Sequence, residues 1–180
     1  MILVKEYTGL DKEQDFVLNA FNGRDSQLFW SPTQKIYSNG AGVIIDLNKQ
    51  LRDYKLYMCY DDCKILAFFL VHSISIKNHR TEMMTYVDPS MRGSITAFTG
   101  WVLILDILQN MQIDNVFAKI FDYNFESMKT AQQLEFSICG VLKDYIVSPN
   151  GKKHDVFLLH RRTKTNELET RWLQKLKKNL

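Results

Sequence analysis

The segment from Thr81 to Phe136 reads as two successive strand–loop–helix units, and this order limits the folds open to the chain. In the first unit the strand-like run T-E-M-M-T-Y-V is followed by the turn D-P-S-M-R-G-S and the apolar run I-T-A-F-T-G-W-V-L-I-L-D-I-L. In the second, V-F-A-K-I-F-D-Y-N is followed by F-E-S-M-K-T-A-Q-Q-L-E-F. A strand that turns through glycine into a helix aims free backbone N–H groups and the positive end of the helix dipole at one point. Two such units in tandem predict a site for an extended phosphorylated cofactor.

The bulk properties of the chain fit one globular domain. Its 180 residues are 46% hydrophobic and 24% charged, an ordinary balance for a domain that buries a full core. The apolar run near Trp101 to Leu108 is too short to span a bilayer, and the N-terminal residues M-I-L-V-K-E lack the basic and apolar regions of a signal peptide. We therefore expect a cytoplasmic protein without a membrane partner.

Three cysteines, Cys59, Cys63 and Cys139, stand without the spacing of a metal site. An odd and sparse set of this kind indicates free thiols in a reducing compartment. Cys59 and Cys63 flank the turn Tyr60-Asp61-Asp62, so a disulfide across a hairpin is the less favoured alternative.

Hydrophobic periodicity along the whole chain predicts an α+β domain, with antiparallel strands first and a β-α-β-α-β order after them. Helices are expected at about 11–21, 43–52, 94–110 and 126–134, strands at about 55–60, 64–73, 81–87 and 116–121, and a closing hairpin at about 137–147 and 154–161. Residues 24–40 carry turn chemistry and are expected to be irregular.

The same stretch resembles the GNAT superfamily of acyl-CoA-dependent N-acyltransferases. The matching positions are Val87-Asp88-Pro89 at the strand end, Arg92-Gly93 in the loop, and Asn124, Ser127 and Leu134-Glu135-Phe136 in a later motif. The ordered set covers about residues 54–162. It implies one GNAT-like domain over 1–162, with a central mixed, mostly antiparallel sheet that is splayed at the cofactor site and flanked by helices. Apart from the resemblance, the apolar residues Leu168, Trp172, Leu176 and Leu180 recur at i+4, and Asn166 with Glu169 suits a helix start. This pattern predicts a basic amphipathic C-terminal helix over 163–180 that packs on that domain or extends from it.

The resemblance also implies an activity. It predicts an N-acetyltransferase that moves an acetyl group directly from acetyl-CoA to a primary amine of a polar small molecule, such as an amino sugar, an amino acid or a polyamine. Backbone groups of the loop would hold the pyrophosphate, and the splayed strand would pair with the pantetheine arm. The cofactor-binding residues implied are Tyr86, Val87, Met91, Arg92, Gly93, Ser94, Ile95, Thr96, Asn124 and Ser127.

Four positions depart from the family pattern: Ser90, Ile95, Ala131 and Glu135. Ile95 stands where a second small residue is usual, and a bulky side chain there narrows the approach of backbone to pyrophosphate. Ala131 stands where many members have a tyrosine that protonates the leaving thiolate. A non-catalytic acyl-CoA-binding module is therefore an alternative.

Amide formation from a thioester needs a base for the amine, a donor for the oxyanion and an acid for the thiolate. The candidates for the base are Glu82 and His79, on or near the strand that lines the acceptor site. Strand alternation places Glu82 on one face with Met84 and Tyr86, and the sequence does not indicate which face meets the acceptor.

Two tyrosines are candidates for the acid, Tyr123 first and Tyr145 second. Three further histidines lack a second ligand at metal spacing and are expected to be structural or exposed, so no metal site is predicted: His72, His154 and His160.

The acceptor would be selected in part by the loop after the first helix, which holds Arg24, Asp25, Phe29, Trp30, Gln34 and Tyr37. These residues suit a polar small molecule and would equally line an interaction surface. Residues 161–180 contain seven Lys and Arg against two Glu, together with Trp172, so nucleic acid is a less favoured partner. The sequence leaves a homodimer open.

Overall fold

A seven-stranded mixed sheet forms the centre of the structure, a computed structural model that describes residues 1–24, 26–30, 35–51, 53–164, 169–171 and 173–174. The strands are β1 (Ile2–Glu6), β2 (Lys55–Asp61), β3 (Lys64–Ser75), β4 (Arg80–Val87), β5 (Asn115–Phe121), β6 (Ser137–Val147) and β7 (Lys153–Arg162). Their spatial order is β1-β2-β3-β4-β5-β7-β6, and only the central pair β4–β5 is parallel.

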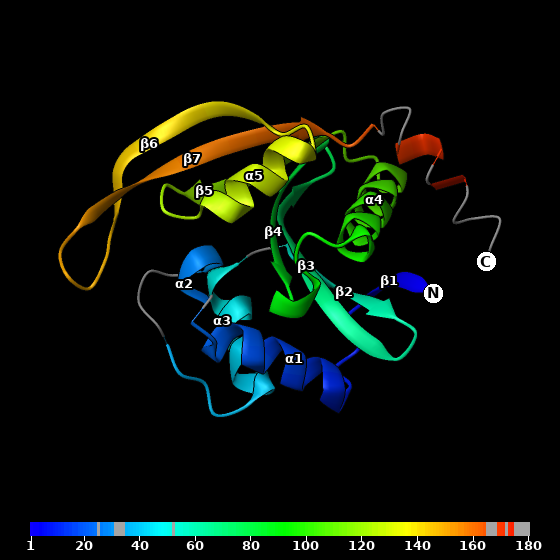
Figure 1. Ribbon diagram of the computed structural model, residues 1–180, viewed down its shortest axis with the longest axis horizontal. Helices are drawn as coiled ribbons and strands as arrows, with labels where there is room; N and C mark the ends of the chain where they lie inside the picture. The colour runs from blue at the N-terminus through cyan, green and yellow to red at the C-terminus, as the bar shows by residue number, and fades with distance from the viewer. Residues whose placement is uncertain (25, 31–34, 52, 165–168, 172, 175–180) are drawn as a thin grey trace.

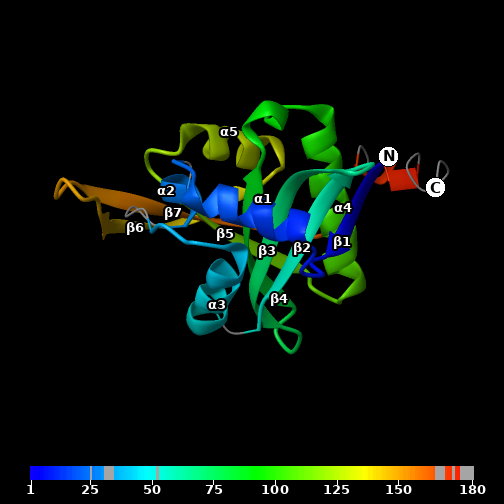
Figure 2. The same ribbon diagram turned by 90° about the horizontal axis from the view of Figure 1, so that it is seen from below.

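Helices cover both faces of this sheet (Figure 1). They are α1 (Asp11–Asn22), α2 (Ser26–Phe29), α3 (Gly40–Gln50), α4 (Ile95–Asn110) and α5 (Phe125–Gln133), with a short 3₁₀ helix η1 (Pro89–Met91). The first three helices lie on one side of the sheet, and α4 and α5 lie on the other (Figure 1). Seen from below, the β6–β7 hairpin extends beyond the helices as a long arm (Figure 2).

Alternate residues of the inner strands supply two separate hydrophobic cores. Met83 of β4 packs into the core under α4 and α5, whereas Met84 and Tyr86 pack against the core under α1 and α3. Two glycines allow helices to approach closely: a Cβ on Gly100 would lie 2.9 Å from the Cys59 sulfur, and one on Gly40 would lie 2.7 Å from Gln14. Strand alternation therefore decides which side of the sheet each β4 side chain serves.

Polar caps set the beginnings of three helices. The Asn39 side chain accepts a hydrogen bond from Gly42 N at 2.8 Å, so α3 begins at Gly40, three residues before the predicted start. Ser94 caps α4 and Asn124 caps α5 in the same way. The turn residues Asn39 and Gly40 thus also start a helix.

The predicted architecture, a mixed and mostly antiparallel sheet flanked by helices, is confirmed. Two elements were not predicted. Strand β1 pairs antiparallel with β2 at one edge of the sheet, and α2 lies within the stretch expected to be irregular. Cys59 is buried and Cys63 is exposed, and both are free thiols.

The chain beyond the last strand returns to the body through an ion pair. Arg161 donates to both carboxylate oxygens of Glu169 at 2.6 and 2.7 Å, both side chains are buried, and Leu173 is buried as well. Five residues on which the predicted C-terminal helix depended lie outside the described residues: Asn166, Leu168, Trp172, Leu176 and Leu180. The two-part division at residue 162 stays a prediction. In the part of the chain that the structure describes, each helix is too short or too polar to cross a membrane.

Candidate active site

The parallel strands β4 and β5 part halfway along their length and leave a fork in the sheet. Their pairing consists of Arg80 with Asn115, Thr81 with Val116 and Glu82 with Phe117. Beyond these positions β4 stays paired with β3 as far as Val87, and β5 stays paired with β7 as far as Phe121. The fork is therefore held open from both sides, and its inner edges present backbone groups that a ligand can reach.

The open end of the fork leads to the N-terminus of α4. The Ser94 hydroxyl accepts from Ala97 N at 3.1 Å, while the N–H groups of Ile95 and Thr96 have no acceptor within the helix because they belong to its first turn. Gly93 precedes them with a φ of +71°, and a Cβ there would meet nothing within 4 Å. Directed N–H groups beside open space suit an anion such as a pyrophosphate.

Two other predicted cofactor residues, Arg92 and Tyr86, make contacts within the protein. The Arg92 guanidinium lies over the Tyr86 ring at 6.0 Å, and its Nε donates to the Val87 carbonyl at 3.3 Å. The Tyr86 ring stacks on Phe68 at 5.6 Å. The side chain of Tyr86 thus belongs to the core on the α1 side, and only its backbone faces the fork.

A buried hydroxyl without a partner belongs to a β4 residue that borders the fork. Thr85 Oγ1 is buried and has no hydrogen-bond partner within the described residues. Thr85 stands on β4 beyond the last residue paired with β5 and shares a strand face with Met83, toward α4 and α5. A buried polar atom of this kind is costly unless something bonds it, so it fits the amide-containing pantetheine arm of CoA.

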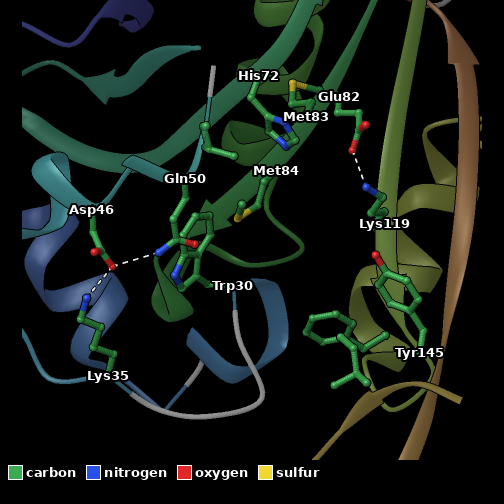
Figure 3. A pocket seen from close by; sticks show the side chains of 13 residues that line it. Trp30, Lys35, Asp46, Gln50, His72, Glu82, Met83, Met84, Lys119 and Tyr145 are labelled. Carbon is green, nitrogen blue, oxygen red and sulfur yellow. Dashed lines mark hydrogen bonds and ion pairs between the residues drawn. The ribbon is translucent and has the colours of Figure 1, made fainter. Parts of the chain in front are cut away.

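On the opposite face, toward α1–α3, the fork borders a cavity of about 460 Å³. It is lined by Trp30, Lys35, Asp46, Gln50, Leu51, His72, Glu82, Met83, Met84, Lys119, Phe121, Tyr145 and Ile146. Figure 3 shows an ion pair on each of two opposite walls, with His72 pointing into the space between them. The volume is within the range of small-molecule sites.

One ion pair spans the closed end of the fork. Glu82 Oε2 on β4 lies 2.8 Å from Lys119 Nζ on β5 (Figure 3). His72 on β3 is the register partner of Glu82, and its Nδ1 lies 3.1 Å from the Ser73 hydroxyl oxygen. Burial lowers the pKa of His72; the Glu82 charge acts against this effect and the Lys119 charge adds to it. The imidazole is therefore neutral near pH 7 and able to accept a proton.

The second ion pair lies across the cavity on α3. One carboxylate oxygen of Asp46 accepts from Lys35 Nζ at 2.7 Å, from the Tyr37 hydroxyl at 2.7 Å and from Gln50 Nε2 at 3.1 Å. The hydrogen bond from Lys35, followed by the one from Tyr37, lowers the pKa of Asp46. Burial, followed by the bond to Asp46, raises the pKa of Tyr37 to about 12. Asp46 is thus a carboxylate whose charge is already compensated.

Of the three predicted catalytic residues, the cavity contains Glu82. His79 lies in the β3–β4 turn at the opposite end of β4 from Val87, where its Nδ1 is 2.7 Å from the Gln112 carbonyl oxygen. Tyr123 donates to the Gln27 carbonyl at 2.8 Å, and burial raises its pKa to about 12. Neither residue is part of the cavity lining, whereas Tyr145 lines it from the β6–β7 arm.

The later sequence motif forms the start of α5. Asn124 is buried, and its side chain accepts from Ser127 N at 3.1 Å, which is the capping role that its position allows. Ala131 is buried in the core under α4 and α5. Ile95 is 61% exposed at the first position of α4, so it stands at the surface beside the cradle.

The predicted acceptor loop reaches the cavity through Trp30, and Tyr37 supports the cavity wall through Asp46. Arg24 is exposed. Asp25, Gln34 and the side chain of Phe29 lie outside the described part of the chain.

Five polar residues of the cavity were missed from the sequence: Lys35, Asp46, Gln50, His72 and Lys119. The sequence carries no signal for His72, because a count of the antiparallel register back from Ser75 and Arg80 would place Ser73 opposite Glu82, and only a register shift between His72 and Ser75 brings His72 there. Lys119 and Asp46 carry no signal either, since each meets the cavity only through tertiary packing.

No family model and no curated protein matches the sequence. Solved structures do match the fold. A spermidine N-acetyltransferase from Vibrio cholerae in complex with CoA and spermine is 16% identical with a TM-score of 0.74, over 90% of this chain and 95% of that chain. A ribosomal-protein-alanine N-acetyltransferase from Brucella melitensis is 16% identical with a TM-score of 0.68, over 89% and 99%. An N-acetyltransferase from Staphylococcus aureus Mu50 is 15% identical with a TM-score of 0.69, over 91% and 99%. The chain therefore has the fold of the GNAT N-acetyltransferases, as the sequence predicted.

Proposed function

We propose that this protein is an N-acetyltransferase that uses acetyl-CoA as co-substrate and acetylates a primary amine. The observation that carries the proposal is the fork between β4 and β5, with the unpartnered hydroxyl of Thr85 on the strand that borders it and the open α4 N-terminus at its end. The pyrophosphate would bind at Gly93 to Thr96 and the pantetheine would lie in the fork. The thioester would then lie at the closed end, beside Glu82.

The acceptor amine would approach from the cavity on the α1–α3 face. Its nitrogen attacks the thioester carbonyl carbon, the C–S bond breaks, and the amine proton passes to a base. His72 is the favoured base, because it is neutral and points into the cavity, and Glu82 would hold the amine beside it. A backbone N–H on the β5-facing edge of β4 would stabilise the oxyanion.

The thiolate leaving group would take its proton from a tyrosine or from water. Tyr145 is the tyrosine that lines the cavity, and Tyr123 is held nearby through the contact of its ring with Phe121, at 5.3 Å between ring centroids. Holding amine and thioester together supplies much of the rate in such reactions, so one weak acid is sufficient. We expect the reaction to take place in the cytoplasm, where the free thiols of the chain stay reduced.

The test is turnover. Purified protein is incubated with acetyl-CoA and with each of a panel of primary amines, and CoA release is followed together with the mass of the product. We expect amine-dependent CoA release and an acetylated amine. Tight acetyl-CoA binding with no acetylated product from any amine would replace this proposal with the non-catalytic acyl-CoA-binding alternative.

A further inference from the structure

Among the described residues that line the cavity, each lysine is paired with a carboxylate before an acceptor binds. Lys119 is paired with Glu82, and Lys35 is paired with Asp46. His72 lies between the two pairs, and burial lowers its pKa. An acceptor therefore fits this cavity when every charged side chain still has a partner of opposite charge after the acceptor binds.

The ion pair at the fork is the one that an acceptor must meet, an argument that rests on the proposed acetyl transfer. Glu82 is the last β4 residue paired with β5, and its register partner there is Phe117. Lys119 lies two residues after Phe117 on β5. The side chains of Glu82 and Lys119 are 31% and 47% exposed, so both ends of the pair are open to a ligand. An amine that reaches the thioester has to pass beside both charges.

The three acceptor classes affect this pair differently. An amino sugar carries one ammonium group, which can replace Lys119 at Glu82 but leaves Lys119 without a counter-charge. A polyamine adds further cations next to Lys119 and Lys35, although each carboxylate of the cavity already has a cationic partner. Like charges in a partly buried site repel, so both classes lose binding energy there.

An amino acid offers both missing partners at once. Its ammonium group can bind Glu82 while its carboxylate binds Lys119, so the zwitterion is inserted into the ion pair and each charge keeps a partner. The two groups of an α-amino acid are attached to one carbon atom, which matches a pair of side chains in direct contact. Apolar residues of the lining would surround a side chain: Trp30, Leu51, Met84, Phe121 and Ile146.

We propose that the acceptor is the free α-amino group of an amino acid with an apolar side chain, its carboxylate bound by Lys119 and its amine by Glu82. Lys119 is then the residue that determines acceptor specificity. Loss of one partner from such a charge pair lowers binding strongly, whereas an acceptor that lacks the carboxylate has nothing to lose.

The test compares matched acceptors in the wild type and in Lys119→Gln. L-leucine and L-phenylalanine are compared with their amides, which keep the amine and side chain but lack the carboxylate, and with spermidine. We expect the wild type to prefer each amino acid over its amide at least about tenfold in kcat/KM. Lys119→Gln should remove this preference, because it lowers kcat/KM more for the amino acids than for their amides, and Lys119→Arg should restore part of it.

Three outcomes would overturn the inference. Faster acetylation of spermidine would indicate a polyamine, and faster acetylation of the amides would indicate the N-terminus of a peptide; acetyl transfer itself would stand in both cases. Absence of CoA release with every acceptor, while calorimetry shows bound acetyl-CoA, would overturn the proposed function and this inference together.

Discussion

Around the fork, the side toward α4 presents backbone groups of one continuous segment, whereas the side toward α1–α3 presents side chains from many elements. The cradle from Gly93 to Thr96 is formed by helix geometry and a positive φ. The cavity instead joins Asp46 of α3, His72 of β3 and Lys119 of β5. A site that binds through backbone groups keeps its ligand when the side chains around it change. A site that binds through side chains can change its ligand while the fold stays the same. The first kind is suited to a constant co-substrate and the second to a variable acceptor.

The largest expected effect concerns the backbone side. Gly93→Trp should weaken acetyl-CoA binding at least about 100-fold, because the new side chain fills the space where a pyrophosphate would lie. Titration calorimetry measures the loss. Gly151→Trp is the matched control, since Gly151 also has a positive φ (+80°) and open space around it but lies at the tip of the β6–β7 arm. Equal affinities for the two variants would show that the cradle is misplaced.

The second prediction concerns His72, in the cavity toward α1–α3. His72→Gln should lower kcat/KM by about 10²- to 10⁴-fold, the usual contribution of a general base, and leave acetyl-CoA affinity within about threefold. His79→Gln is the control, because His79 is exposed in the β3–β4 turn and outside the cavity lining. Steady-state kinetics on both variants decide the point. A loss caused by His79→Gln and not by His72→Gln would return the base to the residue that the sequence indicated.

The third prediction follows from the charges that face His72. Burial and Lys119 lower its pKa, and Glu82 raises it, while the Asp46–Lys35 pair lies across the cavity. Lys119→Met removes one lowering influence and frees Glu82 from its partner, so the pKa of His72 should rise. As the pH falls, His72 of the variant would then become protonated, and stop acting as a base, at a higher pH than in the wild type. NMR titration of the imidazole measures the pKa directly, and an unchanged or lower pKa in Lys119→Met would exclude this coupling.

The smallest expected effect is the change in acetyl-CoA affinity on loss of the Thr85 hydroxyl. Thr85→Val removes a buried hydroxyl that lacks a partner, so the apoprotein should be at least as stable, while acetyl-CoA affinity should fall about 2- to 10-fold with the loss of one hydrogen bond. Thr81→Val is the control on the same strand face. The Thr81 hydroxyl donates to the His72 carbonyl at 2.7 Å, so its loss should lower the melting temperature and leave acetyl-CoA affinity unchanged. Unchanged affinity in Thr85→Val would remove Thr85 from the co-substrate site.

The same contrast explains what the sequence could predict. The strand, glycine turn and helix of the α4 cradle follow one another along the chain, so their order alone indicated the cofactor side. Strand β1 was missed because five residues at a terminus carry little periodicity, and α2 was missed because four residues among turn signals do not show a helical pattern.

The acceptor side depended on packing that local patterns do not encode. Glu82 was named from its place on β4, but the face it serves became known only when Met84 and Tyr86 were found in the core on the α1–α3 side. Tyr123 is close to the site in sequence, yet its hydroxyl bonds the Gln27 carbonyl on α2. Lys119 meets Glu82 only because the β4–β5 register places them on facing edges of the fork.

The most direct test of the central claim, that the fork is a co-substrate site, is a calorimetric titration of the wild-type protein with acetyl-CoA and with free CoA. We expect saturable binding of both at one molecule per chain, through the pyrophosphate and pantetheine groups that they share. Absence of binding at millimolar concentration would contradict it, and the open cradle at Gly93 and the unpartnered hydroxyl of Thr85 would then need another explanation.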